Sequence, residues 1–143
     1  MDQTGETPGA ALAVRIIHAA LVAGVLLAGG TLAFMVRVRG HAPEGGETLG
    51  IVLPVVAIAL LLVSASVLRR RVPERSSQQS PDGYWAAVEN RGAAIVLWAA
   101  TEGAALVSLV GYFLSGVSAA ATVAIVALAA LIVYRPSRLE RAT

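Results

Sequence analysis

The chain has 143 residues, of which 57% are hydrophobic and only 14% charged, and its mean hydropathy is +0.73. A soluble domain carries about 25% charged residues, so this composition excludes an ordinary soluble globule and a disordered chain. The absence of cysteine excludes a disulfide scaffold. The composition therefore indicates an integral membrane protein.

Four apolar stretches follow one another along the chain, each long enough for the roughly 20 residues that a helix needs to cross the hydrocarbon core. Their continuous apolar character excludes the alternating strands of a membrane β-barrel. We therefore predict an all-α fold with four transmembrane helices, arranged as two antiparallel hairpins in one domain that comprises the whole chain, residues 1–143. The helices are expected over about residues 12–36, 49–68, 84–114 and 118–134.

The arginines predict the orientation of these helices. All 11 basic residues are arginine, and nine of them fall on the side that four crossings assign to both termini and the central loop. By the positive-inside rule both termini face the cytoplasm, and residues 69–83 form a basic cytoplasmic loop. Attraction to anionic lipid headgroups explains the arginine cluster of this loop without nucleic-acid binding. The expected headgroup and topology anchors are Arg69, Arg70, Arg71 and Arg75.

The third helix carries two further patterns. Tyr84 and Trp85 are separated from Tyr112 and Phe113 by about the thickness of a bilayer with its headgroups, so the two pairs are expected to form aromatic belts at the two interfaces. Small residues at helical spacing allow close approach of another helix. The expected packing residues are Ala100, Ala104, Ser108 and Gly111.

The sequence offers little for catalysis. It has no thiol nucleophile, no glycine-rich phosphate loop and no serine–histidine–carboxylate set, so we expect no enzymatic activity, no metal site and no cofactor. The two histidines, His18 and His41, are expected near opposite ends of the first helix and cannot share one ligand within a monomer. A haem held between identical subunits through His18 stays an alternative.

Glu102 is the one charged residue between Gly92 and Gly116, the apolar stretch of the predicted third helix. An ionised carboxylate near the middle of a bilayer costs several kcal/mol, about 2.5–3.5 on insertion scales, so intramembrane acids tend to be functional. We expect Glu102 to be protonated and to bind a proton or cation. The alternative is a purely structural carboxylic acid that hydrogen-bonds to a neighbouring helix.

Residues 69–113 resemble the hairpin of the proteolipid, or ring, subunit of rotary ATP synthases. In that family the acid helix follows a basic loop with an Arg-x-Pro turn, which Arg71-Val72-Pro73 matches here. The chain is also similar to small four-helix bacterial membrane proteins with an Ala-x-x-Glu-Gly-x-Ala-Leu third helix, from which no activity carries over. The positions that match the acid-bearing helix of the proteolipid are Arg91, Ala99, Glu102, Leu106, Ser108, Leu109 and Val110.

The resemblance implies a proteolipid-like membrane protein in which Glu102 binds a proton or cation within an oligomer. The proteolipid hairpin carries a glycine repeat, whereas residues 49–68 have one glycine, and two additional helices flank the hairpin here. A second hypothesis is therefore an accessory subunit of a larger membrane complex. The expected partners are the lipid bilayer and either further copies of the chain or other subunits, and the expected location is the bacterial inner (cytoplasmic) membrane.

Overall fold

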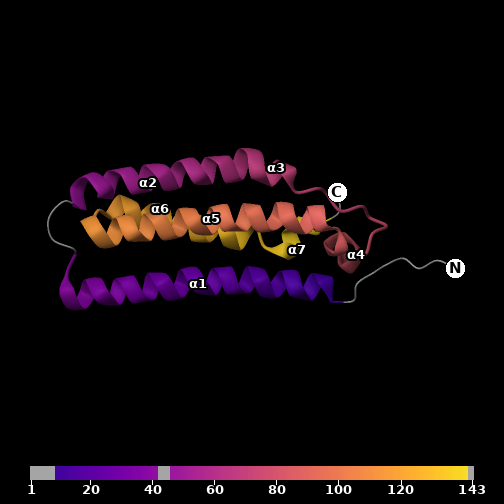
Figure 1. Ribbon diagram of the computed structural model, residues 1–143, viewed down its shortest axis with the longest axis horizontal. Helices are drawn as coiled ribbons and strands as arrows, with labels where there is room; N and C mark the ends of the chain where they lie inside the picture. The colour runs from indigo at the N-terminus through magenta and orange to yellow at the C-terminus, as the bar shows by residue number, and fades with distance from the viewer. Residues whose placement is uncertain (1–8, 42–45, 142–143) are drawn as a thin grey trace.

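The computed structural model describes residues 9–41 and 46–141, and over these residues it is all-α without strands. The long helices run side by side along one axis, and the two ends of the described chain lie at the same end of the bundle (Figure 1). The elements in chain order are α1 (Ala10–Arg39), α2 (Gly46–Val63), the π-helical turn η1 (Ser64–Leu68), α3 (Arg69–Arg71), α4 (Pro81–Ala86), α5 (Val88–Ser115), α6 (Ser118–Val133) and α7 (Pro136–Leu139).

Three helices are long and apolar enough to cross a membrane: α1, the continuous helix Thr48–Arg71 that joins α2, η1 and α3, and α5. The fourth apolar helix, α6, is shorter, with 16 residues. The all-α class is thus confirmed, as is the expectation of long helices that are apolar enough to cross a membrane.

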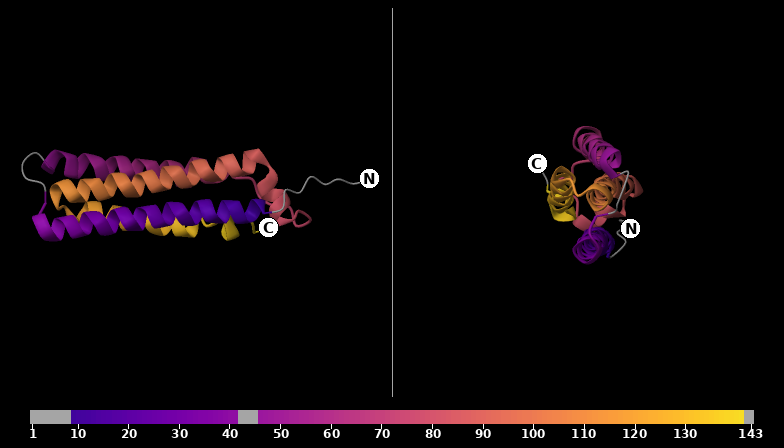
Figure 2. Two further views of the ribbon diagram at one scale, coloured as in Figure 1. Left: turned by 60° about the horizontal axis from the view of Figure 1, so that its bottom comes forward. Right: turned by 90° about the vertical axis from the view of Figure 1, so that its left-hand side faces the viewer.

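Helix α5 is the centre of the bundle. It packs against α2, α6 and α1, and in the end-on view α1 and α2 lie on opposite sides of it (Figure 2). By contrast, α1 contacts α6 much less extensively than it contacts α5. As a result α5 is the most buried of the three long helices and α1 the least.

Glycines allow α2 and α5 to approach closely. A Cβ atom on Gly46 would overlap the backbone of Leu114, and one on Gly50 would overlap the side chain of Ser115. On the other side of the same contact, a Cβ on Gly111 would lie only 3.2 Å from the Cβ of Leu53. The two backbones therefore pack at a distance that larger side chains would prevent.

The first two helices extend beyond their expected bounds. Helix α1 begins at Ala10 and ends at Arg39, against the expected 12–36. The helix expected over 49–68 begins at Gly46 and continues to Arg71. Pro54 therefore lies in the interior of α2 rather than in its first turns.

The helix expected over 84–114 is divided in two. Helix α4 ends at Ala86, Ala87 is extended with φ −64° and ψ 120°, and α5 begins at Val88. Ser80 and Pro81 start α4, with the Ser80 hydroxyl accepting a hydrogen bond of 3.0 Å from the amide of Gly83. The break lets α4 turn across the end of the bundle instead of extending away from it.

This turn overturns the aromatic-belt interpretation for Tyr84 and Trp85. Both side chains are fully buried, so they do not face the membrane interface. The Tyr84 hydroxyl donates to the carbonyl oxygen of Pro73 at 2.6 Å, and the Asn90 amide donates to the carbonyl oxygen of Tyr84 at 2.8 Å. Hydrogen bonds from the Tyr84 hydroxyl and to the Tyr84 carbonyl thus help to keep this segment inside the protein.

Candidate functional site

Glu102 lies in α5 on the side that faces α1. Its Oε1 atom is 3.5 Å from the position that a Cβ atom on Gly24 of α1 would occupy, so the absence of a side chain at Gly24 leaves room for the carboxyl. The side chain is half-buried. Among the described residues, none forms a hydrogen bond or ion pair with it.

Residues of α5 one and two helical turns away from Glu102 also contact α1, so Glu102 lies in the contact between these two helices, here called the α1–α5 seam. Trp98 packs edge-on against the His18 ring of α1, with ring centroids 5.1 Å apart. At the other end, a Cβ on Gly29 of α1 would lie 3.6 Å from Leu109. Because positions three, four and seven apart share one helix face, Glu102 lies between an aromatic contact and an aliphatic contact of the same seam.

One flank of Glu102 is open. Ile95 and Ala99, which precede it by seven and three positions, are exposed, as are Val96 and Val110. These four apolar residues form a strip along α5 that its neighbouring helices leave uncovered. Glu102 therefore lies at the border between the α1 seam and an exposed apolar strip.

The expected packing residues are shared between two neighbouring helices. Ala104 and Ser108 are fully buried, and Ser108 donates to the carbonyl oxygen of Ala120 in α6 at 2.7 Å. Gly111 instead faces α2, as described above, while Ala100 is only half-buried.

The expected headgroup anchors differ in their environment. Arg70 and Arg71 are exposed, whereas Arg69 is half-buried. Arg75 is half-buried and hydrogen-bonded within the protein: its Nε donates to the carbonyl oxygen of Glu140 at 2.7 Å, and its Nη1 donates to the carbonyl oxygen of Gln79. Arg75 thus ties the central loop to the C-terminal segment.

Glu140 is the centre of a polar cluster that our sequence analysis did not identify. Its carboxylate accepts a hydrogen bond of 2.7 Å from the Trp85 indole and forms an ion pair with Arg15 at 3.0 Å. The partners are 55 and 125 positions away in sequence, so no local pattern indicates them. This cluster joins α1, α4 and the residues after α7 at one end of the bundle.

Burial also changes the pKa of the neighbouring Tyr84 side chain. Desolvation raises the pKa of Tyr84; the positive charge of Arg69 lowers it to a smaller extent, and the negative charge of Glu140 adds to the increase. Tyr84 therefore stays a neutral hydrogen-bond donor at physiological pH.

The two histidines lie in different parts of the structure. His18 is buried, and its Nε2 lies 2.9 Å from the carbonyl oxygen of Leu131, so this nitrogen is engaged within the fold. His41 packs edge-on against Tyr112 near the connection between α5 and α6, with ring centroids 5.3 Å apart. Within the described residues, no group of three or more His, Cys, Asp or Glu side chains could hold a metal ion.

In comparisons with known proteins, no family model, no curated protein and no solved structure matches this chain.

Proposed function

We propose that this chain is a non-enzymatic membrane protein that crosses the bacterial inner membrane four times, with both termini in the cytoplasm. The antiparallel packing of α6 on α5 supports a fourth crossing, although its 16 residues extend for only about 24 Å. Nine of the 11 arginines lie on the side of the termini, as the positive-inside rule requires of a cytoplasmic face. A reporter that is active only in the cytoplasm should give signal when fused to Thr143.

Within this membrane protein, Glu102 binds a proton in a proteolipid-like oligomer. The observation that carries the proposal is a half-buried carboxyl in the membrane-spanning part of α5 that no described residue satisfies. A carboxylic acid in hydrocarbon needs a partner or must stay protonated. The exposed strip beside Glu102 is where a second copy would supply that partner.

A proton fits this site better than a metal cation. Hard cations such as Ca²⁺ are coordinated by several oxygen ligands at once. The helical neighbours of Glu102 are Trp98, Ala99, Ala105 and Leu106, and none has a side-chain oxygen. Across the seam, Gly24 offers no side chain at all.

Carbodiimide labelling of intact membranes tests this function. The reagent reacts with protonated carboxyls in apolar surroundings, so Glu102 should be labelled, and more slowly as the pH rises. Glu102→Gln removes the label, and Glu140 is an internal control because its carboxylate is ion-paired. If peptide mapping finds no label on Glu102 over a wide pH range, the proton-binding function is excluded.

The exposed strip also supports a second candidate, an accessory subunit whose α5 packs against a different membrane protein. In that case Glu102 only donates and accepts a hydrogen bond, which glutamine can replace. Extraction in mild detergent separates the two candidates: a homo-oligomer supports proton binding within a ring, and co-purifying foreign subunits support the accessory role.

A further inference from the structure

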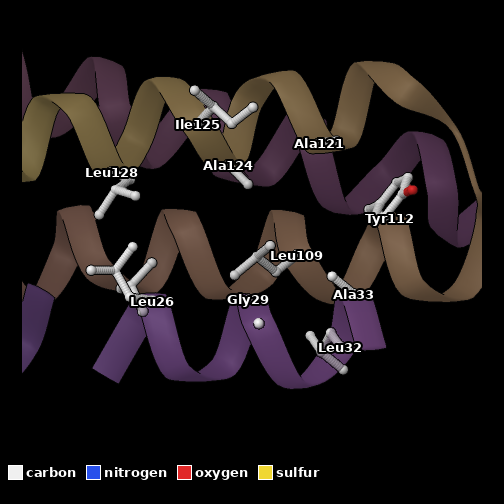
Figure 3. A pocket seen from close by; sticks show the side chains of 12 residues that line it. Leu26, Gly29, Leu32, Ala33, Leu109, Tyr112, Ala121, Ala124, Ile125 and Leu128 are labelled. Carbon is white, nitrogen blue, oxygen red and sulfur yellow. The ribbon is translucent and has the colours of Figure 1, made fainter. Parts of the chain in front are cut away.

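The seam between α1 and α6 is hollow over most of its length. Its outer part, near the connection between α5 and α6, holds a cavity of about 270 Å³ that Figure 3 shows between the two helices, with Leu109 and Tyr112 of α5 lying between them. Small residues cause the gap, because they have too little side chain to fill it: they are Gly29, Gly30, Ala33, Ala121 and Ala124.

A second hollow of about 380 Å³, more open to the outside than the first, continues the same seam toward the termini. Leu26 lines both cavities, and the second also has Val22, Ala23 and Ile132 in its walls. From His18 to Ala33 the seam follows α1 for about 22 Å. One leaflet accounts for about 15 Å of the hydrocarbon core, so the seam has room for an acyl chain along its length.

Arg135 stands at the end of this seam that lies near the termini. It lines the second cavity, it is exposed, and its guanidinium makes no ion pair or hydrogen bond within the described residues. Arg15, at the same end, is already paired with Glu140. A cation without a protein partner at the mouth of an apolar groove is complementary to one amphiphile, a lipid with an anionic headgroup.

Another apolar hollow, between α2 and α6, differs from the α1–α6 seam in its charge. It has about 370 Å³ and is equally apolar, but its lining residues include no charged side chain. Any lipid chain can occupy it, without selection for the headgroup.

We propose that the α1–α6 seam binds one anionic phospholipid of the cytoplasmic leaflet, with its phosphate at Arg135 and an acyl chain along the cavity walls. The inference rests on the membrane orientation of the proposed function, and it does not require Glu102 to bind a proton.

Two variants test the two parts of the site. Arg135→Gln removes the charge. Gly30→Leu places a side chain in the outer cavity, at a position where an added Cβ would meet no atom within 4 Å. Ala33→Leu, at another exposed position of the same wall, is a second filling variant in case the first does not fold. The controls are Arg39→Gln, an exposed arginine at the opposite end of α1, and Gly92→Leu, an exposed glycine of α5 that also has no atom within 4 Å of its added Cβ.

The full chain is reconstituted into phosphatidylcholine vesicles with a minor fraction of phosphatidylglycerol, and the bound lipids are counted by native mass spectrometry after mild detergent extraction. The wild type should retain one phosphatidylglycerol in preference to phosphatidylcholine. Arg135→Gln should lose this preference, and Gly30→Leu should retain about tenfold less lipid, while both controls behave as the wild type.

Three results would overturn the proposal: no preference of the wild type for phosphatidylglycerol, unchanged retention by both site variants, or a protein dimer that Gly30→Leu abolishes, which would identify a second copy as the occupant. Glu102→Gln distinguishes this site from the proposed function, since it should lose carbodiimide labelling and keep the bound lipid.

Discussion

The two helices on opposite sides of α5 are held by different means. Helix α2 packs along its length, with backbones brought close by Gly46, Gly50 and Gly111. Helix α1 packs on α5 through a looser seam that contains the Glu102 carboxyl, and it is joined to the rest of the protein by polar contacts near its beginning. One small bundle thus contains a helix held by close packing, α2, and a helix held by polar contacts near its beginning, α1.

The difference in packing between α1 and α2 explains why both proposed sites lie along α1. A close-packed seam has no space for a proton-exchanging carboxyl or for a lipid chain, whereas the looser α1–α5 seam and the hollow between α1 and α6 leave room for them. The α1 helix therefore provides one wall of each proposed site.

The largest expected effect comes from disturbing the close-packed seam. Gly50→Leu places a side chain where Ser115 lies, and overpacking should lower the free energy of unfolding by about 3 kcal/mol. Gly103→Leu, with open space around the added side chain, is the matched control. Unfolding titrations in mixed detergent measure the difference, and equal stability of the two variants would show that α2 and α5 are not closely packed.

A smaller effect is expected at the end of α1. Glu140→Ala leaves the buried Trp85 indole without an acceptor, which costs about 1–3 kcal/mol. The ion pair itself adds little, because the Arg15 side chain is 51% exposed. Glu140→Gln should cost less than alanine, because its amide oxygen still accepts the indole hydrogen.

The same variants should change how firmly α1 is held. Because the chain has no cysteine, spin labels can be attached to cysteines introduced at the exposed positions Ala13 and Ser137. Glu140→Ala should broaden the distance distribution between the two labels, and Arg138→Ala, on the same short helix α7, should not. An unchanged distribution in Glu140→Ala would mean that the cluster does not fix α1.

The smallest effect is expected from the cap of α1. The residue before the helix is Gly9, which has no side chain, and Asp82 of α4 supplies the acceptor instead, at 2.9 Å from the amide nitrogen of Ala11. Asp82→Ala should therefore destabilise the first turn by about 1 kcal/mol. Hydrogen exchange of the first-turn amides should accelerate, and Glu89→Ala, an exposed acid of α5, should leave it unchanged.

Some features of the site were accessible to sequence analysis because they depend on local composition. A single acid in a long apolar stretch identifies Glu102 as a carboxyl within a helix that is apolar enough to cross a membrane, and small residues four apart identify Ala104 and Ser108 as positions able to contact another helix. Which helix each of them faces depends on how α5 is rotated in the bundle, and hydropathy contains no information on that rotation.

By itself, the sequence determined that the protein is helical and that its long helices are apolar enough to cross a membrane, because the length and hydropathy of a helix are properties of contiguous residues. Four crossings and the orientation stay predictions. Only the tertiary structure decided that α4 turns inward, that Asp82 caps α1, that Glu140 pairs with Arg15, and that α1 and α6 leave a hollow seam. Each of these features joins residues far apart in the chain, and such contacts arise only when the helices have packed in one particular arrangement.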